Sequence, residues 1–171
     1  MTFANRITRA PRAFEPDRGD EALANLPAVP GEVAALIRGA AGCSPFLGGL
    51  IAREAEWLAG ALETAPEVTR AALLEETRGL ERDPAKGLRR LKRRVALLTA
   101  LADLGGVWKL EETTAALTDF ADAATDRAIR STIAQVIARG KLPGLSAEAP
   151  GDGTGGLVAL AMGKMGAHEL K

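Results

Sequence analysis

The end of the sequence contains a glycine-lysine turn with residue types suited to binding phosphate. Gly163-Lys164-Met165-Gly166 follows a short apolar run at residues 157–162, and a possible helix start comes next. A strand, a tight turn and a helix start would direct backbone N–H groups and the Lys164 ammonium at a phosphate. The segment is not a P-loop, because Val158 replaces the required glycine and Met165 replaces the magnesium-binding hydroxyl. An ordinary strand-to-helix turn with a solvated lysine is at least as common.

A second candidate is a dense group of cations between residues 86 and 94. Its members are Lys86, Arg89, Arg90, Lys92, Arg93 and Arg94. Such a group could contact phosphates or an acidic partner, and the four arginines are the candidate contacts. No aromatic residues interleave to stack bases, and apolar residues fill the gaps between the cations. A solvated helix face, with some cations paired to nearby acids, is therefore the simpler interpretation.

The remaining chemically active residue types do not form a recognisable metal or nucleophile site. Asp119, Asp122 and Asp126 share one helical face, where exposed charge explains them better than a metal site. The only histidine, His168, and the only cysteine, Cys43, exclude a classical zinc cluster and disfavour a catalytic triad. The simplest interpretations are an exposed helix position for His168 and a small buried residue for Cys43.

Composition predicts a mainly α-helical protein. The 171 residues include 22 basic and 22 acidic side chains, and the pI is about 6.6. Alanine makes up about a fifth of the chain and tyrosine is absent, a balance that favours helices over sheets. No apolar run approaches the roughly 18 residues of a membrane-spanning helix, and no signal peptide is evident. We therefore expect a cytoplasmic protein that binds neither membrane nor nucleic acid.

Proline and glycine positions predict the helix boundaries. Ser44-Pro45 and Asp83-Pro84 are each a cap residue followed by proline at the first helical position, and Gly105-Gly106 is a stop. Helices are predicted over residues 17–26, 31–41, 45–62, 66–80, 84–104 and 110–138. In the last of these the apolar stripe shifts near Ala128. Either that helix breaks there or its two halves pack on different partners.

The chain divides into three predicted parts: a helical region at 1–139, a Pro/Gly-rich linker at 140–156 and a short C-terminal segment at 157–171. The linker includes a G-x-G-x-x-G match at 151–156, but the match precedes the predicted strand, so a dinucleotide site is excluded. Residues 157–162 are typical of a buried strand. A strand needs neighbours, and the sequence offers none. We therefore predict the truncated start of an α/β domain, poorly structured or paired with a partner.

Several segments, in one order, are similar to a known enzyme family. They are residues 44–47 (Ser-Pro-Phe-Leu), 88–94 (Leu-Arg-Arg-Leu-Lys-Arg-Arg), 102–105 (Ala-Asp-Leu-Gly), 117–124 (Leu-Thr-Asp-Phe-Ala-Asp-Ala-Ala) and 161–170 (Ala-Met-Gly-Lys-Met-Gly-Ala-His-Glu-Leu). From about residue 44 to 170 the chain resembles the N-terminal part of the bifunctional glutamine synthetase adenylyltransferase/adenylyl-removing enzymes. The ending, joined to the arginine-rich helix, makes the resemblance fairly specific.

The resemblance implies a fragment of a nucleotidyltransferase, from the half that removes AMP from glutamine synthetase by phosphorolysis. It implies Mg²⁺ and an adenine nucleotide as cofactors of the parent enzyme, and glutamine synthetase and the PII signalling protein as its partners. Gly163, Lys164 and Gly166 would be the phosphate contacts, while the metal-binding Asp-x-Asp would lie beyond Lys171, which stands where the family has Asn. No Asp-x-Asp occurs in this chain, so the fragment is expected to be inactive. The alternative is a non-catalytic helical interaction module that binds through the face of residues 86–94.

Overall fold

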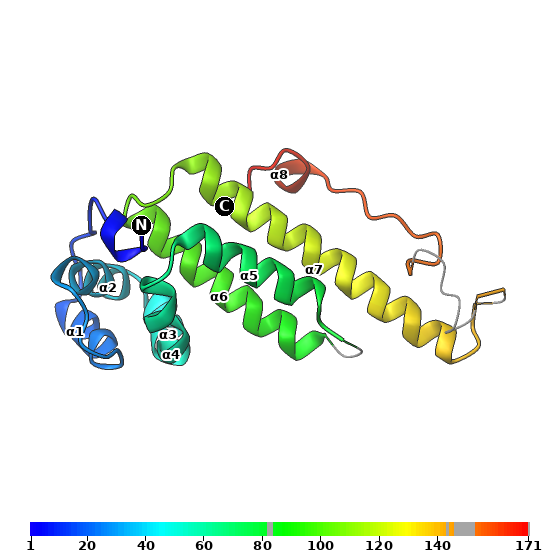
Figure 1. The fold of residues 1–171 in the computed structure, drawn as a ribbon, viewed down its shortest axis with the longest axis horizontal. Helices are drawn as coiled ribbons and strands as arrows, with labels where there is room; N and C mark the ends of the chain where they lie inside the picture. The colour runs from blue at the N-terminus through cyan, green and yellow to red at the C-terminus, as the bar shows by residue number, and fades with distance from the viewer. Residues whose placement is uncertain (82–83, 143, 146–152, 171) are drawn as a thin grey trace.

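Helices make up all the regular structure in the part of the chain that the computed structural model describes, residues 1–81, 84–142, 144–145 and 153–170. The prediction of a mainly α protein is confirmed (Figure 1). In chain order the elements are η1 (Ala4–Arg6), α1 (Pro16–Ala24), α2 (Gly31–Cys43), α3 (Pro45–Arg53), α4 (Ala55–Leu62), α5 (Pro66–Arg78), α6 (Ala85–Leu104), α7 (Leu110–Ala138) and α8 (Gly163–Gly166).

The long helices α5, α6 and α7 lie side by side, and the shorter α1–α4 pack at one end of them (Figure 1). Helix α6 packs against α5, α7, α2 and α3. Its apolar residues Leu91, Leu97 and Leu101 are fully buried, in one core with Leu36 and Ile51. The N-terminal Phe3 is also in this core. The arginine-rich helix α6 therefore packs against both the long helices α5 and α7 and the shorter helices α2 and α3.

Most predicted helix boundaries agree with the structure. Ser44 caps α3, its Oγ accepting the backbone N–H of Leu47 at 3.3 Å, and Pro45 is the first helical residue. Helix α7 spans the predicted residues and begins with the Glu112 carboxylate accepting the backbone N–H of Lys109 at 2.8 Å. The predicted cap Asp83 lies outside the described residues, and α6 begins immediately after Pro84.

The predicted single helix over residues 45–62 is wrong, because the chain bends at Glu54. This residue separates α3 from α4, with φ −114° and ψ 22°. The backbone hydrogen bonds continue through the bend, since the Glu54 N–H donates to the Leu50 carbonyl and the Leu58 N–H donates to the Glu54 carbonyl. Both halves are amphipathic, so the apolar spacing alone could not reveal the break.

Helix α7 is continuous, and its two halves pack on different partners, the second of the two predicted alternatives. Ala116 and Phe120 in its first half belong to the main core. The second half extends past α5 and α6 (Figure 1), yet Ile133 and Ile137 are buried there. The returning chain lies close to this half, because a Cβ built on Gly155 would be 3.3 Å from Ile133.

The predicted strand at residues 157–162 is wrong for this chain, because that segment forms no ladder. It is extended and returns along α7, with a groove of about 530 Å³ between the two. An extended segment becomes a strand only by hydrogen bonding to another, and the described residues include no second one. Its large apolar side chains are exposed: Leu157, Val158, Leu160 and Met162. The predicted linker lies partly outside the described residues, as does Lys171, and the domain division stays a prediction.

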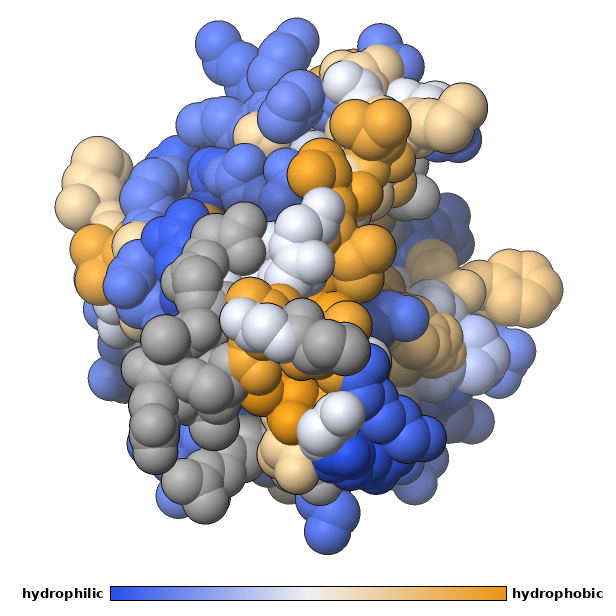
Figure 2. Space-filling view, turned by 90° about the vertical axis from the view of Figure 1, so that its right-hand side faces the viewer, coloured by the Kyte–Doolittle hydropathy of each residue, from blue (hydrophilic) through white to orange (hydrophobic). Residues whose placement is uncertain are grey.

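Apolar side chains also gather on the end of the molecule where α7 extends beyond its neighbours. Figure 2 views this end and shows a run of hydrophobic residues between charged areas. Among the described residues, no helix is both long and apolar enough to span a membrane.

Cys43 differs from its predicted burial. It is exposed at the end of α2, where its Sγ–H donates to the Arg12 carbonyl at 3.1 Å. The neighbouring Gly42 is buried instead. The chain approaches it so closely that a Cβ there would lie 2.9 Å from the Glu15 carbonyl oxygen. Residues 12–15 can approach α2 this closely because Gly42 has no side chain. Cys43, the next residue, is exposed.

Candidate functional site

The glycine-lysine turn predicted to contact phosphate forms the short helix α8. Gly163 has a φ of +57°, in the left-handed region that favours glycine. A Cβ on Gly166 would lie 2.5 Å from the Ala161 carbonyl oxygen. Both glycines are therefore required by the turn itself. Lys164 is exposed, and His168 follows the helix with a φ of 57° and an exposed side chain.

The turn faces the beginning of α7 across an open groove of about 590 Å³. Lys164, His168 and Glu169 line one side of this groove, and Glu111 and Thr114 are among the residues of α7 on the other. The Lys164 side chain is exposed there, and among the described residues its ammonium has no ion pair. Two carboxylates, those of Glu111 and Glu169, line the same groove and lower its attraction for anions. The arrangement can bind a phosphate only weakly by charge.

Two of the four candidate arginines are bound to a buried carboxylate at the α3–α4 bend. The Arg93 Nε lies 2.8 Å from one Glu54 carboxylate oxygen, and the Arg94 Nε lies 2.9 Å from the other. The Glu54 side chain is 5% exposed. The Arg94 guanidinium also lies over the Trp57 ring, 5.2 Å from its centroid, a cation–π contact. Glu54 and Trp57 thus hold α4 against α6.

The Glu54 carboxylate is ionised in this arrangement. Burial raises the pKa of Glu54, but the hydrogen bonds and positive charges of Arg94 and Arg93 outweigh it and lower the pKa below its ordinary value. The negative charge offsets part of the positive charge that the arginine-rich helix accumulates. Arg93 and Arg94 therefore serve the packing of this chain.

The other four cations of α6 divide into one paired and three exposed residues. Arg90 forms an ion pair with Glu76 of α5. Lys86, Arg89 and Lys92 are exposed, and within the described residues they have no ion pair. The interpretation of a solvated face with some cations paired to nearby acids agrees with this arrangement. Of the four candidate arginines, Arg89 is exposed and the other three are partly buried.

The aspartates predicted to be exposed charge on α7 are partly engaged in ion pairs. Asp119 pairs with Arg70 and connects α7 to α5, and Asp126 pairs with Arg130 at 2.8 Å one turn further along α7. Asp122 between them is exposed. Across the described ranges no group of three or more His, Cys, Asp or Glu side chains is placed to hold a metal ion.

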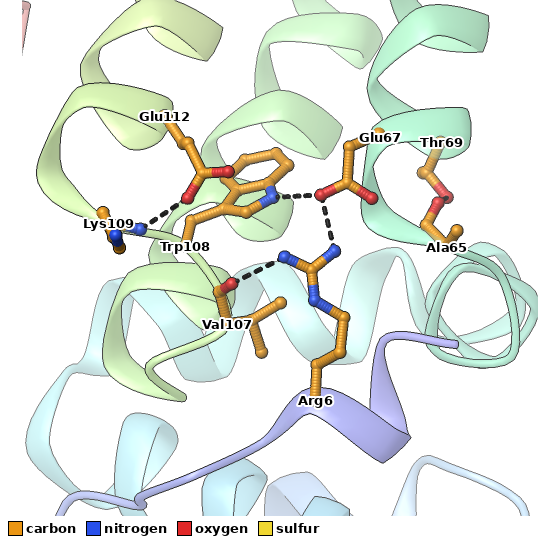
Figure 3. Close-up of polar contacts among 8 residues, drawn as sticks. All are labelled: Arg6, Ala65, Glu67, Thr69, Val107, Trp108, Lys109 and Glu112. Atoms are coloured by element: carbon orange, nitrogen blue, oxygen red, sulfur yellow. Dashed lines mark hydrogen bonds and ion pairs between the residues drawn. The ribbon is translucent and has the colours of Figure 1, made fainter. Parts of the chain in front are cut away.

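A polar network that the sequence did not reveal fastens the N-terminal segment to the helices (Figure 3). The Arg6 guanidinium donates to the Glu67 carboxylate at 2.6 Å and to the Val107 carbonyl at 2.9 Å. The Trp108 indole N–H donates to the same Glu67 oxygen at 3.0 Å. Burial raises the pKa of Glu67, but the hydrogen bonds from Arg6 and Trp108 lower it by more. Arg6 is 61 residues from Glu67, so no local spacing could predict the contact.

The glycine-lysine turn and the arginine-rich helix do not form one site. Helix α7 lies between them, with α8 on one side and α6 on the other (Figure 1). A single phosphate therefore cannot contact both. Each has to be interpreted by itself.

Comparison with known proteins gives the family. The model of the glutamate-ammonia ligase adenylyltransferase family matches residues 34–171. The chain belongs to this family. It is 43% identical over 141 residues to the bifunctional glutamine synthetase adenylyltransferase/adenylyl-removing enzyme of Bradyrhizobium diazoefficiens, covering 79% of this chain and 14% of the relative.

Two further relatives with the same name align over nearly the whole chain. The Caulobacter vibrioides enzyme is 38% identical over 172 residues, covering 94% of this chain and 16% of the relative. A Rhodopseudomonas palustris enzyme is 35% identical over 189 residues, covering 98% of this chain and 19% of the relative. The chain thus spans less than a fifth of the length of these relatives. No solved structure matches it.

Proposed function

We propose that this chain is the N-terminal part of an enzyme that controls glutamine synthetase by adding and removing AMP. The observation that supports this most is the family match over residues 34–171, together with relatives that carry both activities in their names. By the resemblance, the chain comes from the adenylyl-removing half, which releases ADP by phosphorolysis. The resemblance makes PII its regulatory partner, and the cytoplasmic location expected from the sequence is part of the same proposal.

Within that enzyme, the residues of this chain nearest to the chemistry would be Gly163, Lys164 and Gly166. The exposed Lys164 at the start of α8 is suited to contact a nucleotide phosphate. The residues present do not fit a Mg²⁺ site. The sequence has no Asp-x-Asp, and the described residues bring no three carboxylates together. The helical body would then support the turn, with α7 as the surface along which residues 157–170 lie.

We expect residues 1–171 alone to be inactive. Phosphoryl-type transfer depends on metal ions that neutralise charge in the transition state, an effect worth several kcal/mol. A lysine that only binds ground-state phosphate does not accelerate the chemistry. The experiment is to incubate the purified chain with adenylylated glutamine synthetase, phosphate and Mg²⁺, and to measure ADP.

The positive control is a longer chimera in which residues 1–171 of this chain are followed by the remaining sequence of a relative, so that Lys164 and Lys141 are both present. Lys164→Ala in that enzyme should lower ADP release, whereas Lys141→Ala, an exposed lysine away from the turn, should not. ADP formed in proportion to the 171-residue chain would contradict the inactivity. Unchanged release by the Lys164→Ala enzyme would remove Lys164 from the site.

The alternative function is a non-catalytic helical module that binds a protein partner. The observation that favours it is the group of exposed cations on α6, which lies away from the glycine-lysine turn. A longer protein without any AMP transfer, but with binding through α6, would support this alternative.

A further inference from the structure

Three exposed cations on α6, which we call the basic row, follow one another at a spacing of three residues. The row consists of Lys86, Arg89 and Lys92. At 1.5 Å per residue it is about 9 Å long along the helix axis. Residues three apart lie on neighbouring positions of a helix surface, so successive charges of the row are neighbours, and the row covers about a third of the helix circumference.

The position of the basic row is unfavourable for the helix that contains it. The positive end of a helix dipole is at its N-terminus, where acidic residues stabilise and cations destabilise. Helix α6 has no acidic residue in its first turn, and the sequence has no Asp or Glu from residue 85 to 102. Helix α7, in contrast, begins with Glu111 and Glu112. Cations in a first turn without an acidic residue depart from the local rule for helix stability, and such departures are found at functional positions.

The neighbouring helices do not compensate the basic row either. The acids that reach α6 from its neighbours are Glu54 and Glu76, and they pair with Arg93, Arg94 and Arg90. Within the described part of the chain, the other cations of this group on α6 are paired with carboxylates, whereas those of the basic row are not.

From these observations we infer that the basic row is a docking surface for an acidic, carboxylate-rich segment of a protein partner. Three cations over about 9 Å match a short acidic stretch, because opposite charges across an interface set its orientation and partner. Nucleic acid is a poorer match, since the chain has no net charge and α6 contains no aromatic residue to stack on bases. The inference depends on α6 alone and goes beyond the proposed enzyme function.

The test measures binding of a fluorescein-labelled octaglutamate peptide to the full 171-residue chain by fluorescence anisotropy at low salt. The variant K86A/R89A/K92A removes the basic row. The matched control R12A/R53A/K141A removes three exposed cations that are scattered over the surface. An oligothymidylate of the same charge is measured in parallel. Thermal melts of both variants verify that they are folded.

We expect the basic-row variant to bind the octaglutamate about tenfold more weakly, because three exposed ion pairs are lost together. The control should change binding less than about twofold, and added salt should weaken binding of the wild type. No binding by the wild type, or equal losses in the two variants, would overturn the inference. Tighter binding of the oligothymidylate than of the octaglutamate would also overturn it and indicate a nucleic-acid partner.

Discussion

Glu54 links the bend between α3 and α4 to two arginines of α6. It ends α3, begins α4 and accepts hydrogen bonds from two arginines, while its own side chain is almost completely buried. A buried carboxylate is tolerated because both of its oxygens have a cationic partner. The Arg94 guanidinium also lies over the Trp57 ring of α4. A single side chain at the bend thus connects it to the arginine-rich helix.

Glu54→Gln should lower the free energy of unfolding by about 2–3 kcal/mol, because it leaves two partly buried arginines without their counter-charge. Glu76→Gln is the matched control. Its ion pair with Arg90 is about 40% exposed on both sides, so the expected loss is less than about 1 kcal/mol. Urea denaturation followed by circular dichroism gives both values. Equal losses would contradict a special role for Glu54.

The same residue should make stability depend on pH. The pKa of Glu54 lies below its ordinary value of 4.5 in the folded chain, so the folded state binds a proton less tightly than the unfolded state. The resulting stability is fully present above pH 4.5 and is lost as the pH falls through the folded pKa. The pKa of Glu67 is also lowered in the folded chain, so Glu67 likewise contributes stability that is lost as the pH falls. Glu54→Gln should therefore flatten the acid limb of a stability-against-pH curve, and an unchanged limb would contradict this assignment.

At the scale of elements, the sequence predicted the helices well and their contacts poorly. Ser44-Pro45, Pro66 and the glycines after Leu104 mark boundaries through local backbone chemistry, which acts over a few residues. The bend at Glu54 and the Arg6 network depend on partners about 40 to 100 residues away, which local patterns do not contain. The glycine-lysine turn was found by residue type, but its separation from α6 follows only from the fold.

The N-terminal segment should contribute strongly to stability, although the family model begins only at residue 34. Phe3 is 1% exposed within the core, and its N–H donates to the Thr64 carbonyl at 2.8 Å. Phe3→Ala should therefore cost about 3–5 kcal/mol of unfolding free energy. Phe14→Ala, the same change at a side chain that is 83% exposed, should cost less than about 0.5 kcal/mol. A small loss at Phe3 in urea denaturation would mean that the segment packs only loosely.

At the scale of the whole molecule, the helical core and the returning C-terminal segment differ in how their backbones are satisfied. Residues beyond the first turn of each helix have their N–H groups paired within the helix, whereas residues 157–162 are extended, exposed and outside any ladder. The strand predicted from this apolar run requires a neighbouring strand that the described residues do not provide. The composition of this segment is that of a strand, but composition does not determine which segment pairs with it.

Amide hydrogen exchange should separate these two parts. In the 171-residue chain, residues 158–161 should exchange orders of magnitude faster than the buried positions Ala116 and Phe120 of α7, because only the latter are hydrogen bonded within the core. In a longer family member that supplies further strands, residues 158–161 should become protected. Strong protection in a dilute monomer of the short chain would contradict this.

The length of α7 has a consequence for how the molecule moves in solution. Its 29 residues form a rod of about 43 Å, which alone is as long as the diameter of about 40 Å of a compact sphere of this chain length, and the second half of the rod extends past α5 and α6. The continuous helix therefore makes the molecule elongated, as Figure 1 shows along its horizontal axis. An elongated particle tumbles anisotropically and diffuses more slowly than a sphere of equal mass. A domain attached at either end of such a rod would sweep a wide arc for a small rotation of the core.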